Sequence, residues 1–144
     1  MKASLLLSFL FLATLNFSCK KSKSGDDPGV TRITTLELQY AVPSFSFSGL
    51  TYTFRVRFEE LGEIEEFGIL YVPWIADKTQ KTPTWGDPET RSAPFPISPS
   101  AAGTIETSSV TLLYSDFNNA NYRAYAIKSD GSVVYGEVMY FSIA

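Results

Sequence analysis

The sequence predicts an all-β fold, a single antiparallel two-sheet β-sandwich formed by residues 30–144. Three observations lead to this prediction. Short segments are rich in branched and aromatic residues, turn residues separate them, and a length of about 115 residues suits one sandwich domain. The expected strands cover residues 33–40, 52–58, 67–72, 109–113, 122–127 and 133–141.

Each expected strand has its own sequence pattern. Residues 33–40 and 52–58 alternate with a period of two, as half-buried strands do. Residues 67–72 form a continuous apolar run, and residues 109–113 alternate less cleanly. The last two strands flank an Asp-Gly pair at residues 130–131, a hairpin signal because glycine accepts the positive φ of a tight turn.

The N-terminal segment predicts export and lipidation. An apolar run after Met1-Lys2 ends in the small residue Ser18 and the only cysteine, Cys19, and is shorter than the roughly 20 apolar residues of a membrane span. Leu15 to Cys19 resembles a relaxed bacterial lipobox, which implies a signal peptide at residues 1–18 and acylation of Cys19. The alternative is a chance cysteine after an ordinary signal, although structural cysteines of exported proteins come in pairs.

Residues 19–29 are expected to form a lipidated flexible tether. They are polar and rich in turn residues, and such a composition buries no core. Lysines followed by Asp26-Asp27 near an acylated cysteine resemble the tethers of surface-exposed lipoproteins in some Gram-negative bacteria. The resemblance implies anchoring in the outer membrane with the domain at the cell surface, and the periplasmic face is the alternative.

The composition excludes several function classes. The chain has 15 acidic and 12 basic residues, and residues 30–144 hold thirteen acidic against eight basic ones, so a nucleic-acid partner is not expected. No histidine is present, which excludes histidine triads and histidine metal sites. Paired carboxylates within Glu59 to Glu66 could in principle hydrolyse glycosides, but consecutive glutamates in a turn are usually solvated. We therefore expect no enzyme, no metal and no cofactor apart from the lipid on Cys19.

The C-terminal hairpin resembles a known family. Residues 122–131, 134–138 and Phe141 are similar to the closing hairpin of fibronectin type III-like repeats in bacterial surface proteins, and residues 66–71 resemble their middle strand. The resemblance implies an immunoglobulin-like, fibronectin type III-like sandwich. Ala120 stands where these repeats carry a tyrosine, so the tyrosine corner is expected to be absent or supplied from elsewhere.

The same alignment predicts a partner-binding face. It points Tyr122, Ala124 and Ala126 into the core, together with Met139 and Phe141. The opposite face would then be exposed and apolar enough to contact a partner. The alternative is that such residues merely suit a pleated strand. The partner-face candidates are Leu70, Val72, Arg123, Tyr125 and Tyr140, with Val138 beside them.

The long connection at residues 73–103 is the second candidate region, because long loops in compact domains are often functional. Trp74 and Trp85 are candidate platforms for sugar rings, and Asp87 is a candidate acceptor for sugar hydroxyls, with Asp77 and Glu89 nearby. In the alternative interpretation Trp74 fills the end of the sandwich and the prolines stiffen a covering loop.

Two functions remain open at this point. The first is a lipid-anchored binding module for a glycan or protein at the outer membrane surface, which requires Trp85 to be exposed. The second is a structural or assembly subunit of an envelope complex, which packs on a partner or adds an edge strand to its sheet.

Overall fold

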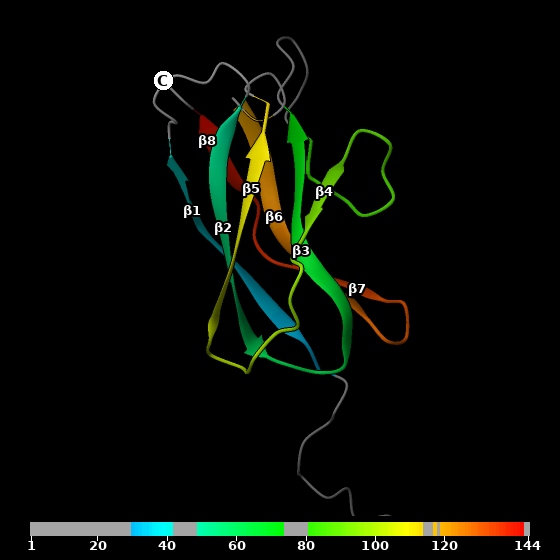
Figure 1. The fold of residues 1–144 in the computed structure, drawn as a ribbon. Helices are drawn as coiled ribbons and strands as arrows, with labels where there is room; N and C mark the ends of the chain where they lie inside the picture. Colours follow the sequence, from blue (N-terminus) through cyan, green and yellow to red (C-terminus); the bar gives the residue numbers. More distant parts are fainter. Residues whose placement is uncertain (1–29, 42–48, 74–80, 114–116, 118, 143–144) are drawn as a thin grey trace, which may run out of the picture.

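The computed structural model describes residues 30–41, 49–73, 81–113, 117 and 119–142, and they form an all-β fold of two antiparallel sheets (Figure 1). Several sequence predictions lie outside these residues, namely the signal peptide at 1–18, the tether with Cys19, Trp74 and Asp77. Within the described part of the chain, no helix is long and apolar enough to cross a membrane.

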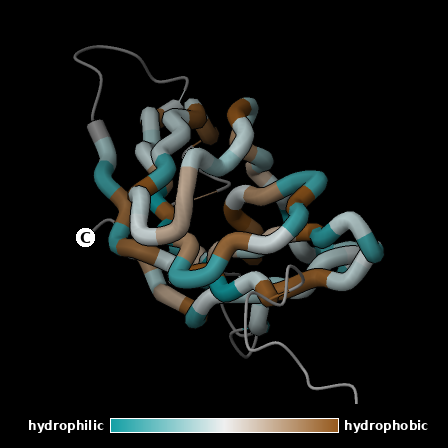
Figure 2. Tube along the Cα trace, turned by 90° about the horizontal axis from the view of Figure 1, so that it is seen from below, coloured by the Kyte–Doolittle hydropathy of each residue, from teal (hydrophilic) through white to brown (hydrophobic). Residues whose placement is uncertain are grey.

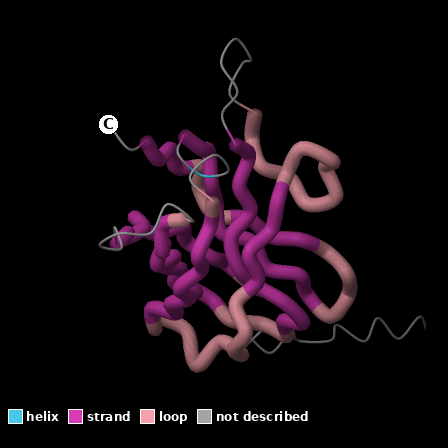
Figure 3. The backbone as a smooth tube through the Cα atoms, turned by 45° about the horizontal axis from the view of Figure 1, so that its top comes forward, coloured by secondary structure: helices cyan, strands magenta, loops and turns pink. Residues whose placement is uncertain are grey.

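The described residues form eight strands. The first sheet has the order β1-β2-β5, and the second has the order β4-β3-β6-β7, with β8 also paired to β6. Figure 3 shows how strands make up most of the described chain. The strands are β1 (Arg32–Ala41), β2 (Leu50–Glu60), β3 (Ile64–Pro73), β4 (Arg91–Pro94), β5 (Ile105–Leu112), β6 (Asn119–Lys128), β7 (Val133–Tyr135) and β8 (Met139–Ser142).

The predicted strands are confirmed with two corrections. The first five predicted segments lie at β1, β2, β3, β5 and β6. The expected loop at residues 73–103 contains β4, which pairs with β3 from Gly68↔Pro94 to Tyr71↔Arg91. The expected last strand, 133–141, is interrupted between β7 and β8.

The core lies between the two sheets. β2 contributes Tyr52, Phe54, Val56 and Phe58, all fully buried, as its alternating pattern predicts. Figure 2 shows that apolar and hydrophilic positions are interspersed along the described chain. From the second sheet Tyr122, Ala124 and Ala126 face the same core, as predicted. Phe117 is fully buried in it.

Phe117 is the centre of an aromatic cluster. Its ring centroid lies 4.7 Å from that of Tyr52, 5.1 Å from Tyr71 and 5.5 Å from Phe141. The Tyr52 hydroxyl also donates to the Phe117 carbonyl at 3.4 Å. Ala120 is buried and has no hydroxyl, so the hydroxyl of Tyr52, from the opposite sheet, holds the backbone at Phe117, two residues before β6.

Thr35 explains why the last strand is interrupted. Its hydroxyl accepts from the Ala124 N–H at 2.9 Å and donates to the Glu137 carbonyl at 2.6 Å. A Cβ at Gly136 would lie 2.4 Å from this hydroxyl oxygen and 2.7 Å from the Thr35 nitrogen, so no side chain fits there. β1 of the first sheet thus inserts a side chain into the gap between β7 and β8.

Candidate functional site

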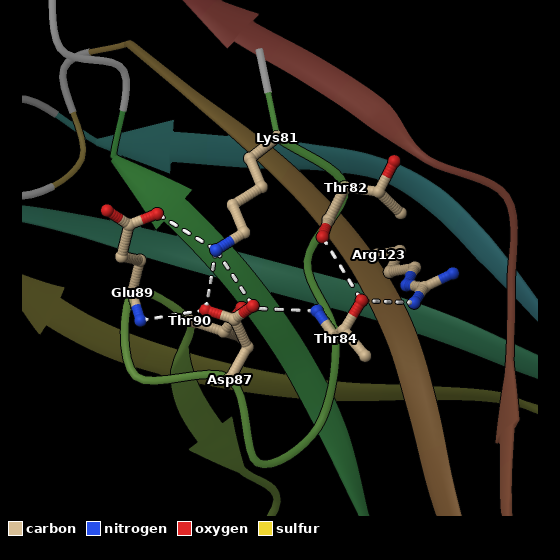
Figure 4. A network of polar contacts seen from close by, with 7 residues as sticks. All are labelled: Lys81, Thr82, Thr84, Asp87, Glu89, Thr90 and Arg123. Carbon is tan, nitrogen blue, oxygen red and sulfur yellow. Dashed lines mark hydrogen bonds and ion pairs between the residues drawn. The ribbon is translucent and has the colours of Figure 1, made fainter. Parts of the chain in front are cut away.

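The outer face of the second sheet is covered, which corrects the prediction of an exposed partner face. Leu70, Val72 and Tyr125 point away from the central core as expected, but they are only 1%, 9% and 0% exposed. The segment from Lys81 to Thr90 passes in front of β3 and β6 and covers this face (Figure 4). Its Pro83 is fully buried.

Other members of the predicted face have different environments. Val138 and Tyr140 are exposed, and the Tyr140 hydroxyl donates to Asn119 Oδ1 at 3.1 Å. Arg123 is partly buried beside the covering segment. The prediction of one continuous exposed patch was wrong because strand alternation assigns a face, whereas burial depends on what packs against that face.

An ion network gives the covering segment its shape. The Lys81 ammonium donates to Asp87 and Glu89 at 2.9 Å each, and Asp87 also accepts from the Glu89 N–H at 2.9 Å. The hydrogen bond from Lys81 is the main cause that lowers the pKa of Asp87, and the bond to Asp87 is the main cause that raises the pKa of Lys81. The contacts of Asp87 are therefore internal, and they order the loop that carries Trp85.

The segment is also bonded to the sheet beneath it. Asn121 Nδ2 donates to the Lys81 carbonyl at 3.2 Å, and the Trp85 N–H donates to the Tyr135 hydroxyl at 3.2 Å. These contacts join the loop to β6 and β7, which are paired through Tyr125↔Tyr135. The position of Trp85 is thereby fixed by two strands of the sheet.

Trp85 stands at the tip of a tight turn. The Asp87 N–H donates to the Thr84 carbonyl at 3.2 Å, and Gly86 has a φ of 79°, a conformation that favours glycine. One face of the indole stacks on Tyr125, with ring centroids 5.0 Å apart and an interplanar angle of 26°. Trp85 is nevertheless 39% exposed. The turn and the stack together hold an exposed indole in one orientation.

Tyr125 supports the indole from below. Its hydroxyl donates to Glu66 Oε1 at 2.5 Å, and burial, followed by this carboxylate, raises the pKa of Tyr125. The phenol therefore stays neutral and hydrogen-bonded. Tyr125, which was predicted to contact a partner, instead provides the ring surface on which the indole of Trp85 packs.

Arg123 adds a cation next to the indole. Its guanidinium carbon lies 3.8 Å from the centroid of the Tyr135 ring, a cation–π contact, and Nη2 donates to Thr84 Oγ1 at 3.5 Å. The buried Nε has no hydrogen-bond partner within the described residues, and burial lowers the pKa of Arg123. No carboxylate of the described chain forms an ion pair with Arg123.

The structure therefore brings Trp85, Tyr125 and Arg123 together and adds two residues that sequence reasoning missed, Thr84 and Tyr135. The Asp-Gly turn at residues 130–131 could have identified Tyr135, since a hairpin there places Tyr135 opposite Tyr125. For Thr84 the sequence offered no signal beyond its position next to Trp85. We call Thr84, Trp85, Arg123, Tyr125 and Tyr135 the Trp85 site.

The acidic cluster at residues 59–66 is divided among separate local contacts. Glu59 accepts from Arg57 at 2.7 Å and Thr34 at 3.0 Å, and Arg57 is the main cause that lowers its pKa. Glu60 pairs with Arg32, Glu63 accepts from Ser129, and Glu66 accepts from Tyr125. Among the described residues, no group of three potential metal ligands is found.

Comparisons of this chain with protein-family models, with curated proteins and with solved structures found no match.

Proposed function

We propose that this chain is a lipid-anchored cell-envelope protein whose folded part is a non-catalytic binding module, contacting a glycan or a protein through the Trp85 site. The observation that carries the proposal is the exposed indole of Trp85, fixed from below by Tyr125. The proposed anchor is acylated Cys19, in the outer membrane of a Gram-negative bacterium with the domain at the cell surface. Its support is the lipobox-like sequence before Cys19 and the polar tether after it.

We also propose that the fold is of the immunoglobulin-like, fibronectin type III-like class. The arrangement of β1-β2-β5 in one sheet and β4-β3-β6-β7 in the other supports this, together with the family resemblance of the closing hairpin. The fold by itself favours no particular function, because β-sandwiches of this class have many unrelated functions. The functional proposal therefore depends on the Trp85 site.

The chemistry of the site favours a ligand with flat apolar faces and polar edges. An indole that is already held in one orientation loses little conformational entropy when a ligand stacks on it. The guanidinium of Arg123 can donate to hydroxyl or carboxylate oxygens, because no carboxylate of the described chain occupies it. A sugar ring has this combination of surfaces, and so does a side chain of a protein partner.

Tryptophan fluorescence tests the proposal directly, since the chain has only two tryptophans. In a Trp74→Phe variant the emission reports Trp85 alone, and titration with a panel of envelope and extracellular polysaccharides is expected to shift it. The Trp85→Ala variant is expected to lose binding, and Ile97→Ala, which removes another exposed apolar side chain, is the matched control. Unchanged emission across the panel removes the glycan branch. Equal partner recovery in pull-downs with Trp85→Ala and Ile97→Ala removes the protein branch.

Protease shaving of intact cells tests the location. Cleavage of the native chain from outside, with loss of membrane retention in a Cys19→Ala variant, is expected for a surface lipoprotein. Protection of a membrane-bound chain contradicts surface display and places the domain in the periplasm.

A second candidate function, a structural or assembly subunit, is favoured by one specific observation. β5 is an edge strand whose outer side pairs with no strand of the described chain. Strand addition at such an edge is a common way for proteins to associate.

A further inference from the structure

The two sheets present four edges, and three of them carry features that hinder pairing with another chain. β1 has register irregularities between Arg32 and Ile33 and between Leu36 and Gln39. β4 has only four residues and ends at Pro94. The remaining edge is interrupted between β7 and β8, where Thr35 lies. Bulges, prolines and short or broken strands are the usual protections of sheet edges.

β5 has no bulge, proline or break, and its one charged residue, Glu106, points inward. Its eight residues pair with β2 in an unbroken register from Leu50↔Leu112 to Arg57↔Ile105. It contains no proline, lysine or arginine. Its single ionisable side chain, Glu106, is buried and accepts from the Ser100 N–H at 2.6 Å. The free edge of β5 is therefore regular and presents no charge.

The solvent-exposed face of β5 carries hydroxyl side chains in its middle and apolar side chains at its ends. Ser109 bonds to Thr53 at 2.8 Å and Thr111 bonds to Thr51 at 3.2 Å, across to β2. Ile105 at the start is 42% exposed, and Leu113 directly after the end is 55% exposed. These two are among the large apolar side chains that the fold leaves in solvent.

We propose that β5 pairs antiparallel with β5 of a second copy of this chain, about a two-fold axis at Ser109. The pairing joins two three-stranded sheets into one continuous sheet, β1-β2-β5-β5-β2-β1. The absence of exposed charge on β5 permits self-pairing, because like charges on directly opposed residues would oppose it. The exposed backbone groups of β5 then gain hydrogen-bond partners along the whole strand.

The side-chain pattern selects this register. Residues directly opposite one another must lie on the same face of the joined sheet, so their positions in the sequence differ by an even number. The two-fold axis therefore lies where one residue faces its own copy, and not between two residues. An axis at Ser109 places Ile105 opposite Leu113 on both sides and Thr107 opposite Thr111. An axis at Ser108 would instead place Leu113 opposite Gly103 and leave it without an apolar partner. Only the first register covers both exposed apolar residues.

The proposed lipid anchor is compatible with this dimer. The two-fold axis puts the first residues of the two β1 strands at opposite ends of the joined sheet. An extended chain spans at most about 3.5 Å per residue, so the fully extended tether of residues 19–29 is roughly as long as β1. Both anchors reach one membrane when the strands lie along its surface.

Disulfide trapping in membranes tests the pairing. Ser109→Cys places one thiol at the axis, directly opposite its copy, and oxidation is expected to give a covalent dimer. Thr53→Cys, on the same face but one strand inward, is the control, because its copies lie three strand spacings of about 4.8 Å apart, too far for a disulfide. The wild-type chain reports any linkage through Cys19 itself.

The register is tested with two further variants. Thr107→Cys and Thr111→Cys are each expected to give little dimer alone and to cross-link with each other when co-expressed. Ser109→Lys brings like charges together at the axis and is expected to halve the mass of the purified chain measured by light scattering. Gln39→Lys, also exposed but on β1, is expected to leave the dimer mass unchanged.

Cross-linking of Ser109→Cys no greater than that of Thr53→Cys overturns the proposal, as does a monomer mass for the wild-type chain. Cross-linking of Ser109→Cys into a heavier species with another protein also overturns it and assigns the edge to a different partner. Because no variant here alters the Trp85 site, failure of the pairing leaves the glycan-binding test unaffected.

Discussion

The hydroxyl of Thr35 is expected to contribute more to the free energy of unfolding than an ordinary surface hydroxyl does. It accepts from the N–H of Ala124, which is fully buried, and donates to the Glu137 carbonyl. In a Thr35→Val variant the Ala124 N–H keeps no partner, which costs about 1–3 kcal/mol, and loss of the second bond adds about 0.5–1.5 kcal/mol. The expected loss in the free energy of unfolding is therefore about 2–4 kcal/mol.

Urea denaturation of the purified protein measures this loss. With an m value of about 2 kcal/mol/M, the midpoint is expected to fall by roughly 1–2 M without a change in m. Thr35→Ser keeps the hydroxyl and is expected to stay close to wild type. Thr34→Val removes a hydroxyl that bonds to Glu59 near the surface and is expected to cost about 0.5–1.5 kcal/mol at most.

The ordering of these three variants decides the matter. If Thr35→Val loses no more stability than Thr34→Val, the bridge between β1 and the interrupted last strand is not what holds β6, β7 and β8 together. The same conclusion follows if Thr35→Ser is as destabilised as Thr35→Val, because the loss would then come from packing rather than from the hydroxyl.

Two further predictions concern Gly136 and Asp87. Gly136→Ala is expected to destabilise by about 1–3 kcal/mol through overpacking against Thr35, and a loss below about 0.5 kcal/mol in urea denaturation, the range of an ordinary surface substitution, would contradict the steric argument. The pKa of Asp87 is lowered in the folded state, so the contribution of its network to stability is present above the ordinary value of 3.8 and is lost as pH falls through the lower folded value. In a Trp74→Phe background, acidification below about pH 4 is expected to shift the Trp85 emission, and Asp87→Asn should abolish that transition; an unchanged transition in Asp87→Asn refutes the assignment.

The strands were predictable because their signals are local. Alternation in β2 specifies which of its side chains face the core, and the Asp-Gly turn specifies the hairpin between β6 and β7. β4 was not predictable, since Arg91–Pro94 has no alternation or branched residues and pairs only because Gly68 of β3 allows the close approach of Ala93 and Pro94.

The candidate site was predictable in part. Trp85 was a binding candidate from its residue type and its place in the long connection, and the binding hypothesis required it to be exposed; it is 39% exposed. The burial of Tyr125 was not predictable, because it depends on a segment about forty residues earlier in the chain that folds over β6. The role of Asp87 in binding Lys81 follows from the same folding of the loop.

The sequence by itself determined the all-β class, the positions of most strands and the side of each strand that faces the core. These properties depend on the residue types within a few positions, and alternation with a period of two expresses them directly. The tertiary structure alone decided which outward faces are covered, where the last strand breaks and which sheet edge stays regular. Those outcomes depend on contacts such as Thr35 with Ala124 and Trp85 with Tyr125, between residues that are far apart in the chain and that no local pattern links.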